Sequence, residues 1–505
     1  MQRRQSARGE WVPTDGQWPV DPQEDVEVSQ DRIWVDGCFD FAHHGHAGAM
    51  LQARQLGTEL LVGVHSDEAI LENKGPTVMR LDERVMAVEA CRWATKAIPK
   101  APYVTSLPWI SHYGCHYVVH GDDITSDSDG KDCYRYVKAA GRFKVVKRTP
   151  GISTTDLVGR MLLCTKSHFI QSLQKRLSGD EGPGGEAERL ETGQAMLQRI
   201  KDYATDESGR APGCDVWYWH ASRPAKLRRT TTSNTTGEHQ QTHRPGTHRQ
   251  ESTNSQFGPV KEEKGKFHQL VEGKGVRPGQ IVVYVDGGWD LFSSGHIEFL
   301  RLVTRSEEDA AKARGWYTEE AKKERIEKTG QDYGPVFLVA GIHEDEVINH
   351  WKGINYPIMN IFERGLCALQ CKYVHAAIFG APFSISKAFL LGLPYNTPQN
   401  PSTETTPTTG NTLPLVYHGE TKFMPLTYDP YAVPKALNIY REIANHEFQN
   451  VNAAEIVARI MKGRALYEER QRKKGEKGMG EEVEKLRQEL EREQRRKEVE
   501  GQFGL

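Results

Sequence analysis

The sequence lacks any run of about eighteen apolar residues, so we expect no transmembrane helix and no stable insertion into a membrane. Its first twenty residues hold no apolar segment of the kind that signal peptides need, so no secretory signal is expected. The eight cysteines form no C-x-x-C pair and are irregularly spaced, which favours free thiols in a reducing compartment over a disulfide framework. These absences predict a cytoplasmic protein.

The chain also lacks an excess of charge of either sign. Its 66 lysines and arginines nearly balance 68 aspartates and glutamates, which leaves a formal net charge of -2. Nucleic acid is therefore not an expected partner, because binding to a phosphate backbone needs a positive surface. The length of 505 residues is enough for two or more domains.

From Ile33 to about Leu163 the sequence alternates short apolar runs with helical patterns. The runs RIWVDG, ELLVGVH, CHYVVHG and FKVVKR predict strands, and the segments between them, such as DERVMAVEACRWA, predict helices. Apolar strands that alternate with helices predict an α/β fold, namely a Rossmann-like, doubly wound parallel sheet. Ligands of such sheets bind at the carboxyl ends of the strands.

The same pattern resumes near Gln280, so the chain is predicted to carry two tandem copies of one domain. Five pairs of residues share one constant offset between the copies: Asp36 and Asp286, Gly37 and Gly287, Asp40 and Asp290, Gly45 and Gly295, His46 and His296. Further along, Lys74 corresponds to Lys352 and Arg84 to Arg364.

Changes in composition set the predicted boundaries. We predict a flexible N-terminal arm over residues 1–30, a first domain over 31–170, a low-complexity, disordered linker over 171–270, a second domain over 271–465 and a charged helical tail over 466–505. The linker is polar and Thr-rich, and it has too few apolar residues to offset the entropy cost of ordering. Insertions at 306–334 and 397–413 distinguish the second domain.

The stretch HHGH, His43 to His46, lies where a predicted strand ends and a predicted helix begins. The unpaired N–H groups of a helix N-terminus and their partial positive charge suit phosphate, and Gly45 permits a close approach. His43 and His46 could donate hydrogen bonds to phosphate oxygens and stabilise charge on a transferred phosphoryl group. The alternative at this stage is that they only cap or pack.

A second candidate phosphate site is the stretch KRTPGISTT, Lys147 to Thr155, at the last strand-to-helix junction. Arg148 can bind phosphate oxygens in a bidentate manner, and the hydroxyls of Ser153, Thr154 and Thr155 can donate hydrogen bonds to them. A simple helix cap, for which Ser153 would suffice, is the alternative. Lys74, on a loop after the second strand, is a third candidate cation.

The motif DGCFDFAHHGH followed by RTPGISTTDLVGRML resembles the cytidylyltransferase family of the nucleotidylyltransferase superfamily. Two tandem copies resemble the branch of that family that uses phosphoethanolamine. The resemblance covers both predicted domains, but not the arm, most of the linker, the insertions or the distal tail. It implies that CTP and phosphoethanolamine react to give CDP-ethanolamine and pyrophosphate on the route to phosphatidylethanolamine. It also implies Mg²⁺ bound mainly by substrate phosphates and leaves a peripheral association with the endoplasmic reticulum open.

The resemblance implies roles for individual residues of the first copy. The implied catalytic residues are His43, His46, Lys74 and Arg148. The implied nucleotide-binding residues are Gly37, Asp40, Gly45, Arg84, Asp123, Ser153, Thr154 and Thr155. Among these, Gly37 and Asp40 would shape the nucleotide pocket, Asp123 would contact the cytosine and Arg84 would contact phosphate.

The second copy has Ser293 in place of His43, and REIANHEFQNVNAA stands where the first copy has RTPGISTT. We therefore predict a degenerate domain that is not an independent catalyst. A weak nucleotide site could remain there, with contacts from Gly287, Asp290, Gly295, His296 and Lys352. Two alternatives for the whole chain stay open: a cytidylyltransferase for another phospho-alcohol such as phosphocholine, and a non-enzymatic nucleotide-binding scaffold. The sequence does not determine the oligomeric state, and a homodimer is compatible with it.

Overall fold

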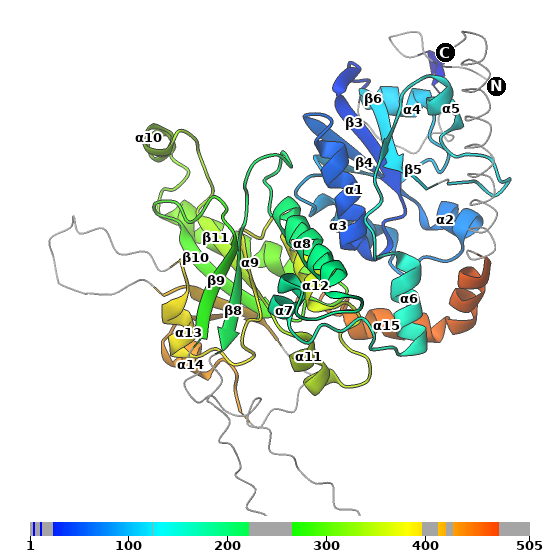
Figure 1. The fold of residues 1–505 in the computed structure, drawn as a ribbon. Coiled ribbons are helices and arrows are strands. Elements are labelled where there is room, and N and C mark those ends of the chain that lie inside the picture. Colours follow the sequence, from blue (N-terminus) through cyan, green and yellow to red (C-terminus); the bar gives the residue numbers. More distant parts are fainter. Residues whose placement is uncertain are drawn as a thin grey trace, which may run out of the picture.

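The computed structural model describes residues 24–123, 125–221, 265–395, 413–420 and 428–473, and it pairs two short strands, β1 (Arg4–Gln5) and β2 (Trp11–Val12). Two α/β units lie side by side, the first drawn in blue to cyan and the second mainly in green to orange (Figure 1). No helix of the described segments is both long and apolar enough to cross a membrane.

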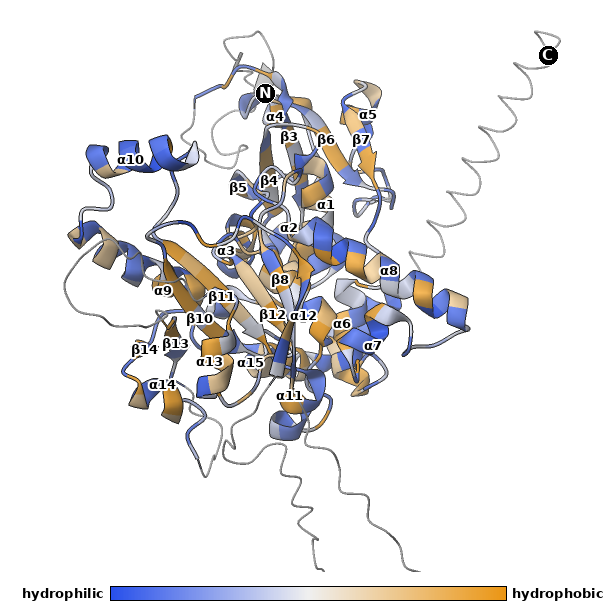
Figure 2. Ribbon diagram, turned by 60° about the vertical axis from the view of Figure 1, so that its left-hand side comes forward, coloured by the Kyte–Doolittle hydropathy of each residue, from blue (hydrophilic) through white to orange (hydrophobic). Residues whose placement is uncertain are grey.

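The first unit is built on a five-stranded parallel sheet in the order β5-β4-β3-β6-β7. Its strands are β3 (Ser29–Gly37), β4 (Glu59–His65), β5 (Lys96–Ala101), β6 (Cys115–Gly121) and β7 (Phe143–Val146). Its helices are η1 (Asp40–Ala42), α1 (His44–Arg54), α2 (Asp67–Lys74), α3 (Leu81–Glu89), α4 (Leu107–His112), α5 (Arg135–Ala139) and α6 (Thr154–Leu163). Strand β4 is buried after its first residue and β3 over residues 33–36, and this explains why both contain apolar runs in the sequence (Figure 2).

The second unit repeats this order with two strands added at one edge, β14-β13-β10-β11-β12-β8-β9. The repeated strands are β10 (Ile281–Gly287), β11 (Val336–Ile342), β12 (Ala376–Phe379), β13 (Leu415–Gly419) and β14 (Tyr440–Ile443). The helices are α9 (Ser294–Ala313), α10 (Glu319–Thr329), α11 (Asp345–Lys352), α12 (Ile361–Leu369), α13 (Lys387–Gly392), α14 (Ala432–Ala436) and α15 (Ala453–Lys462). The predicted tandem Rossmann-like fold is confirmed.

The predicted disordered linker needs correction, because much of residues 171–270 is folded. The segment contains α7 (Leu173–Ser178), α8 (Glu186–Tyr203), β8 (Asp215–Ala221) and β9 (Gly265–Val271, one residue past it). Strand β8 pairs in parallel with β12 and antiparallel with β9, so it buries Val216, Tyr218 and Trp219 in the second unit. These strands have no counterpart in the first copy, so the repeat could not reveal them. Residues 222–264 of the predicted linker lie outside the described residues.

Other predicted boundaries also shift. The predicted N-terminal arm is anchored at its end, since Val26 N–H donates to the carbonyl of His112 at 3.0 Å and β3 begins at Ser29. The first insertion folds as the end of α9 and the whole of α10. Most of the second insertion lies outside the described residues. Residues 464–473 are helical, and the remainder of the predicted tail is likewise not described.

The two units are joined by equivalent elements that face each other. Helix α3 of the first unit and its counterpart α12 carry Glu83 and Glu363, and each glutamate binds an arginine of the opposite unit. Arg160 on α6 donates to Glu363 at 2.7 and 2.8 Å, and Arg459 on α15 donates to Glu83 at 2.7 and 2.9 Å. One cluster of buried apolar residues runs through both units, and each unit has a further cluster of its own.

Candidate functional site

The turn between β3 and α1 presents the HHGH motif at the carboxyl edge of the first sheet. Its backbone is unusual: Phe39, Phe41 and Ala42 all have positive φ, at 56°, 64° and 41°. His43 caps α1, and its Nδ1 accepts a hydrogen bond from Gly45 N–H at 3.1 Å. Strained non-glycine backbone of this kind persists where the surrounding structure fixes it, and it clusters at functional sites.

The histidines of this turn differ in environment. The rings of His43 and His46 are stacked, with centroids 3.9 Å apart and an angle of 17° between their planes. His44 points inward, and burial lowers its pKa to about 3, so it is neutral at physiological pH. Burial and the nearby Asp40 raise the pKa of the Cys38 thiol to about 11, which leaves it protonated and a poor nucleophile. His43 is buried and His46 is partly buried, so the turn encloses both rings, and their contacts with phosphate stay a prediction.

The second predicted phosphate motif packs directly against the first. A Cβ atom at Gly45 would lie 2.7 Å from Cγ2 of Ile152, so only glycine fits where the KRTPGISTT segment approaches α1. Gln52 of α1 donates to the carbonyl of Lys147 at 2.9 Å and accepts from its N–H at 3.1 Å. The structure therefore brings together two motifs that are about a hundred residues apart in the sequence.

The N-terminus of α6 lies at this junction. Ser153 is its cap, accepting from Asp156 N–H at 3.0 Å, and Thr154 and Thr155 are its first two residues. Residues 148–153 and Asp156 line an open pocket of about 430 Å³. Arg148 donates to the Asp123 carboxylate at 2.9 Å, and both side chains are about half exposed. Both residues are predicted site residues, so a nucleotide that binds Arg148 or Asp123 would have to replace this ion pair.

Lys74 ends α2 on the loop side of the same sheet edge. It is exposed, and its ammonium lies 5.6 Å from the centroid of the Tyr103 ring. Gly75, with a φ of 91°, ends the helix directly after it. Lys74 is therefore the last residue of α2, and the position of its side chain depends on the loop that follows.

Two predicted nucleotide contacts are placed inside the protein instead. Arg84 is 1% exposed and donates to the carbonyls of Met79 and Cys38 and to Asp67 Oδ1 at 2.6 Å. A phosphate contact would require Arg84 to give up these bonds, and its role in nucleotide binding stays a prediction. Asp40 is also 1% exposed and accepts from the N–H groups of Val78 and Met79, so its effect on the pocket is through the loop it holds.

Sequence reasoning missed a group of polar residues at the strand ends. Asp36 accepts hydrogen bonds from Trp34 Nε1, Thr105 Oγ1 and Tyr134 OH at 2.8, 2.5 and 2.8 Å. His65 ends β4 and His120 lies near the end of β6, and burial lowers the pKa of both. The internal repeat carried a signal for these residues, since VHSDE and VVHGDD of the first copy match IHEDE and VYHGET of the second.

The corresponding turn of the second unit is occupied by its own chain. Ser293 Oγ donates to the carbonyl of Val451 at 2.7 Å, and a Cβ at Gly295 would lie 2.8 Å from the Phe448 carbonyl. His296 Nδ1 accepts from Ser293 N–H at 3.2 Å, and burial lowers its pKa to about 3. Burial also lowers the pKa of Lys352. The turn is retained in the second unit, and Ser293 is as buried as His43, but its hydroxyl is bound to the backbone of its own unit.

Comparisons with known proteins identify the family of the chain. Residues 34–160 match the model of the Cytidylyltransferase-like family. The chain is 35% identical to the ethanolamine-phosphate cytidylyltransferase of Dictyostelium discoideum over 88% of its length and 94% of that protein. It is also 35% identical to the ethanolamine-phosphate cytidylyltransferase of Mus musculus, over 88% of this chain and 89% of that one. Choline-phosphate cytidylyltransferase A of Rattus norvegicus is 36% identical over only 30% of this chain and 41% of its own. With two folded units and near full-length similarity, the chain belongs to the family of ethanolamine-phosphate cytidylyltransferases.

Proposed function

We propose that the first unit transfers the cytidylyl group of CTP to phosphoethanolamine, giving CDP-ethanolamine and pyrophosphate. The observation that carries this proposal is the packing of the HHGH turn against the RTPGIST segment, where Ile152 meets Gly45. Two helix N-termini, α1 and α6, then face one site that can hold several phosphates. Full-length similarity to enzymes of that name supports the choice of acceptor.

The reaction needs positioning and charge neutralisation rather than a covalent intermediate. A phosphate oxygen of phosphoethanolamine attacks the α-phosphorus of CTP in line, and pyrophosphate leaves with the electrons of the broken P–O bond. His43 and His46 would donate hydrogen bonds to the α- and β-phosphates, where negative charge develops. Lys74 would neutralise the phosphates from the other loop, and Arg148 with the hydroxyls of α6 would hold the triphosphate.

The proposal includes Mg²⁺ that arrives with the nucleotide and lowers the charge of the leaving pyrophosphate. In the described parts of the chain, no group of three or more His, Cys, Asp or Glu side chains could hold a metal ion, so phosphate oxygens would supply most of its ligands. Chelation with EDTA should abolish turnover, and added Mg²⁺ should restore it. Full activity in EDTA would contradict this part of the proposal.

We further propose that the second unit is not an independent catalyst. Its turn has Ser293 in place of the first histidine, and Val451 and Phe448 cover the anion-binding side. Its predicted nucleotide contacts would require this cover to move. A cytoplasmic location is also part of the proposal, and it is supported by the eight cysteines, which are all free thiols. The proposal is compatible with a homodimer and with a peripheral association with the endoplasmic reticulum.

A competition assay tests the choice of substrate. The purified full-length protein would receive CTP and equal concentrations of phosphoethanolamine and phosphocholine, and both products would be quantified by mass spectrometry. We expect CDP-ethanolamine to predominate at least tenfold. A preference for CDP-choline would support the other cytidylyltransferase, and binding of CTP without either product would support the scaffold.

A further inference from the structure

The second unit continues past α15 through the helical residues 464–473, and side chains of both helices hold the loop that follows Lys74. Three successive carbonyls of this loop each accept a hydrogen bond from the C-terminal helices. The three pairs are Arg470 Nη1 to Pro76 at 2.7 Å, Tyr467 OH to Thr77 at 3.0 Å and Arg459 Nη1 to Val78 at 3.4 Å. A candidate phosphate-binding lysine of one unit is thus attached to a loop whose backbone is bound by the other.

Arg470 is the member of this set next to Lys74. Its Nη1 lies 3.5 Å from Asp40 Oδ2, and Asp40 itself binds the N–H groups of the same loop. Its aliphatic stem covers Gly75, where a Cβ would be 3.4 Å from Arg470 Cγ. One guanidinium therefore bridges a loop carbonyl and the buried carboxylate that fixes the loop from the other side. The next residue, Gln471, donates to the carbonyl of Thr155 in α6 at 2.7 Å.

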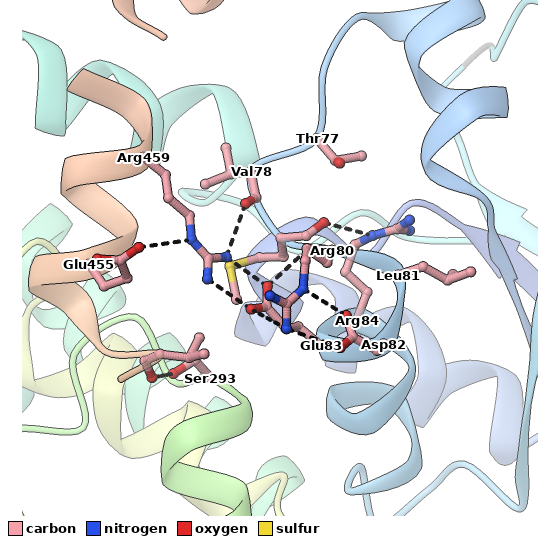
Figure 3. Close-up of polar contacts among 12 residues, drawn as sticks. Thr77, Val78, Arg80, Leu81, Asp82, Glu83, Arg84, Ser293, Glu455 and Arg459 are labelled. Carbon is pink, nitrogen blue, oxygen red and sulfur yellow. Dashed lines mark hydrogen bonds and ion pairs between the residues drawn. The ribbon is translucent and has the colours of Figure 1, made fainter. Parts of the chain in front are cut away.

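Arg459 fixes the far end of the loop (Figure 3). It points from α15 toward Glu83, and Glu83 in turn accepts from Arg80 N–H at 2.9 Å, at the start of α3. This contact has an equivalent in the opposite direction, because Arg160 donates to the carbonyl of Ile358 and to Glu363. It therefore belongs to the interface that joins the two units.

The contact of Arg470 has no such charged equivalent. His168 donates to the carbonyl of Pro357 at 2.8 Å, as Tyr467 does to Thr77, so the two C-terminal segments align residue by residue. By that alignment the position of Arg470 is Gln171 in the first unit, an uncharged residue. The additional arginine is directed only at the unit whose turn keeps both histidines.

We propose that Arg470 is a positioning residue for catalysis in the first unit, acting from the second unit through the Lys74 loop. This inference rests on the proposed cytidylyltransferase activity. An unbound loop samples many conformations, and a lysine on it would meet the phosphates in the required geometry for only part of the time. Arg470 reduces that freedom and balances the charge of Asp40. The second unit then contributes to the reaction without binding substrate.

The test compares Arg470→Met with Arg464→Met in the full-length chain. Arg464 lies on the same helix and, among the described residues, pairs with Glu468 of that helix, with both side chains about half exposed. We expect Arg470→Met to lower kcat about tenfold, with the KM for CTP changed by less than threefold, and Arg464→Met to leave both unchanged. Arg470→Lys, which keeps the charge near Asp40 without the planar fork, should recover part of the lost kcat.

A double-mutant cycle with Lys74→Ala shows whether Arg470 acts through the lysine. We expect Arg470→Met to have less than a twofold further effect on kcat when Lys74 is already absent. A full tenfold effect in that background, or equal kcat for Arg470→Met and Arg464→Met, would overturn the inference while leaving the proposed function intact. A wild-type protein that makes no CDP-ethanolamine would instead overturn the proposed function. If Arg470→Met fails to fold, Arg470→Lys replaces it in the double-mutant cycle with Lys74→Ala.

Discussion

The two copies of the β–α turn show how neighbours decide what one residue type does. His46 and His296 are both partly buried, but His46 stacks on His43, whereas His296 stacks on Phe292 and accepts a hydrogen bond from Ser293 N–H. Burial lowers the pKa of His296 to about 3, so it stays neutral and structural. Histidine at the same motif position is therefore predicted to bind phosphate in the first unit and to cap a helix in the second.

Replacing each histidine by alanine tests this contrast. His46→Ala should lower kcat by two orders of magnitude or more, roughly the range for loss of a proton- or charge-stabilising group. His296→Ala, its matched control, should keep kcat within about threefold per folded molecule but lower the thermal stability, because a cap worth about 1 kcal/mol is lost. Steady-state kinetics and thermal unfolding measure both. Residual turnover of His46→Ala sets an upper limit on catalysis by the second unit, and near-normal turnover would contradict the site assignment.

Asp286 gives a pH-dependent prediction. Burial raises its pKa to about 7, above the ordinary aspartate value of 3.8, although Tyr431 OH donates to it at 2.6 Å. The folded protein therefore binds this proton more tightly than the unfolded chain, so its contribution to stability is present at low pH and is lost as the pH rises from about 4 to about 7.

Asp286→Asn removes the buried charge and keeps an acceptor for Tyr431. We expect a higher free energy of unfolding than wild type at pH 8, and a difference that shrinks toward pH 5. The control is Asp36→Asn, which should destabilise at both pH values because that carboxylate accepts from three donors. Chemical denaturation at the two pH values decides this, and a pH-independent effect of Asp286→Asn would contradict it.

At the scale of elements, exchanged ion pairs hold the helices of one unit to those of the other. The pair Arg160–Glu363 is nearly enclosed, with side chains only 10% and 6% exposed. Glu363 also accepts from Asn360 N–H and so caps α12. The glutamate therefore serves both its own helix and the interface.

Glu363→Ala should leave a buried arginine with only part of its charge balanced. We expect it to lower the free energy of unfolding by about 3–5 kcal/mol, the cost of breaking a buried pair. Glu324→Ala is the matched control, because its pair with Lys328 on α10 is more than 60% exposed and screened by water, so its loss should leave the free energy of unfolding close to that of wild type. Denaturant unfolding curves would compare the two, and equal losses would contradict the assignment.

At the scale of the molecule, the two units share one hydrophobic core. Backbone bonds also cross between them, since Arg92 N–H donates to the Gln370 carbonyl and Lys372 N–H to the Ala90 carbonyl, both at 2.8 Å. The units resemble two subunits of a pseudo-symmetric dimer joined in one chain. Under the proposed function, one side holds the phosphate site and the other supports it.

A shared core predicts that the units unfold together. Differential scanning calorimetry of the full-length protein should show one cooperative transition, since neither unit can expose its interface helices without disrupting the core of the other. CTP should raise the transition temperature of the whole protein if it binds the folded state. Two well-separated transitions would show that the units are independent domains.

The sequence alone determined the fold class and the location of the phosphate motifs. Apolar strand runs, helix periodicity and the internal repeat depend on the order of residues along the chain, so they can be recognised from the sequence without the structure. HHGH and RTPGISTT named the residue types that phosphate needs, and the comparisons confirmed the family. Their individual roles stay predictions.

Only the tertiary structure decided which of the repeated residues are bound by distant parts of the protein. The sequence does not show whether Arg84 and Asp40 bind a ligand or the protein itself. Their partners, Cys38 and the loop at Val78, lie 38 or more residues away. The strands β8 and β9 join the second sheet because β12 has a free edge, and the periodicity of the sequence does not show that this edge exists. Arg470 reaches Pro76 across 394 residues. Such contacts are set by packing between distant segments, so the sequence could name the chemistry but not the neighbours that control it.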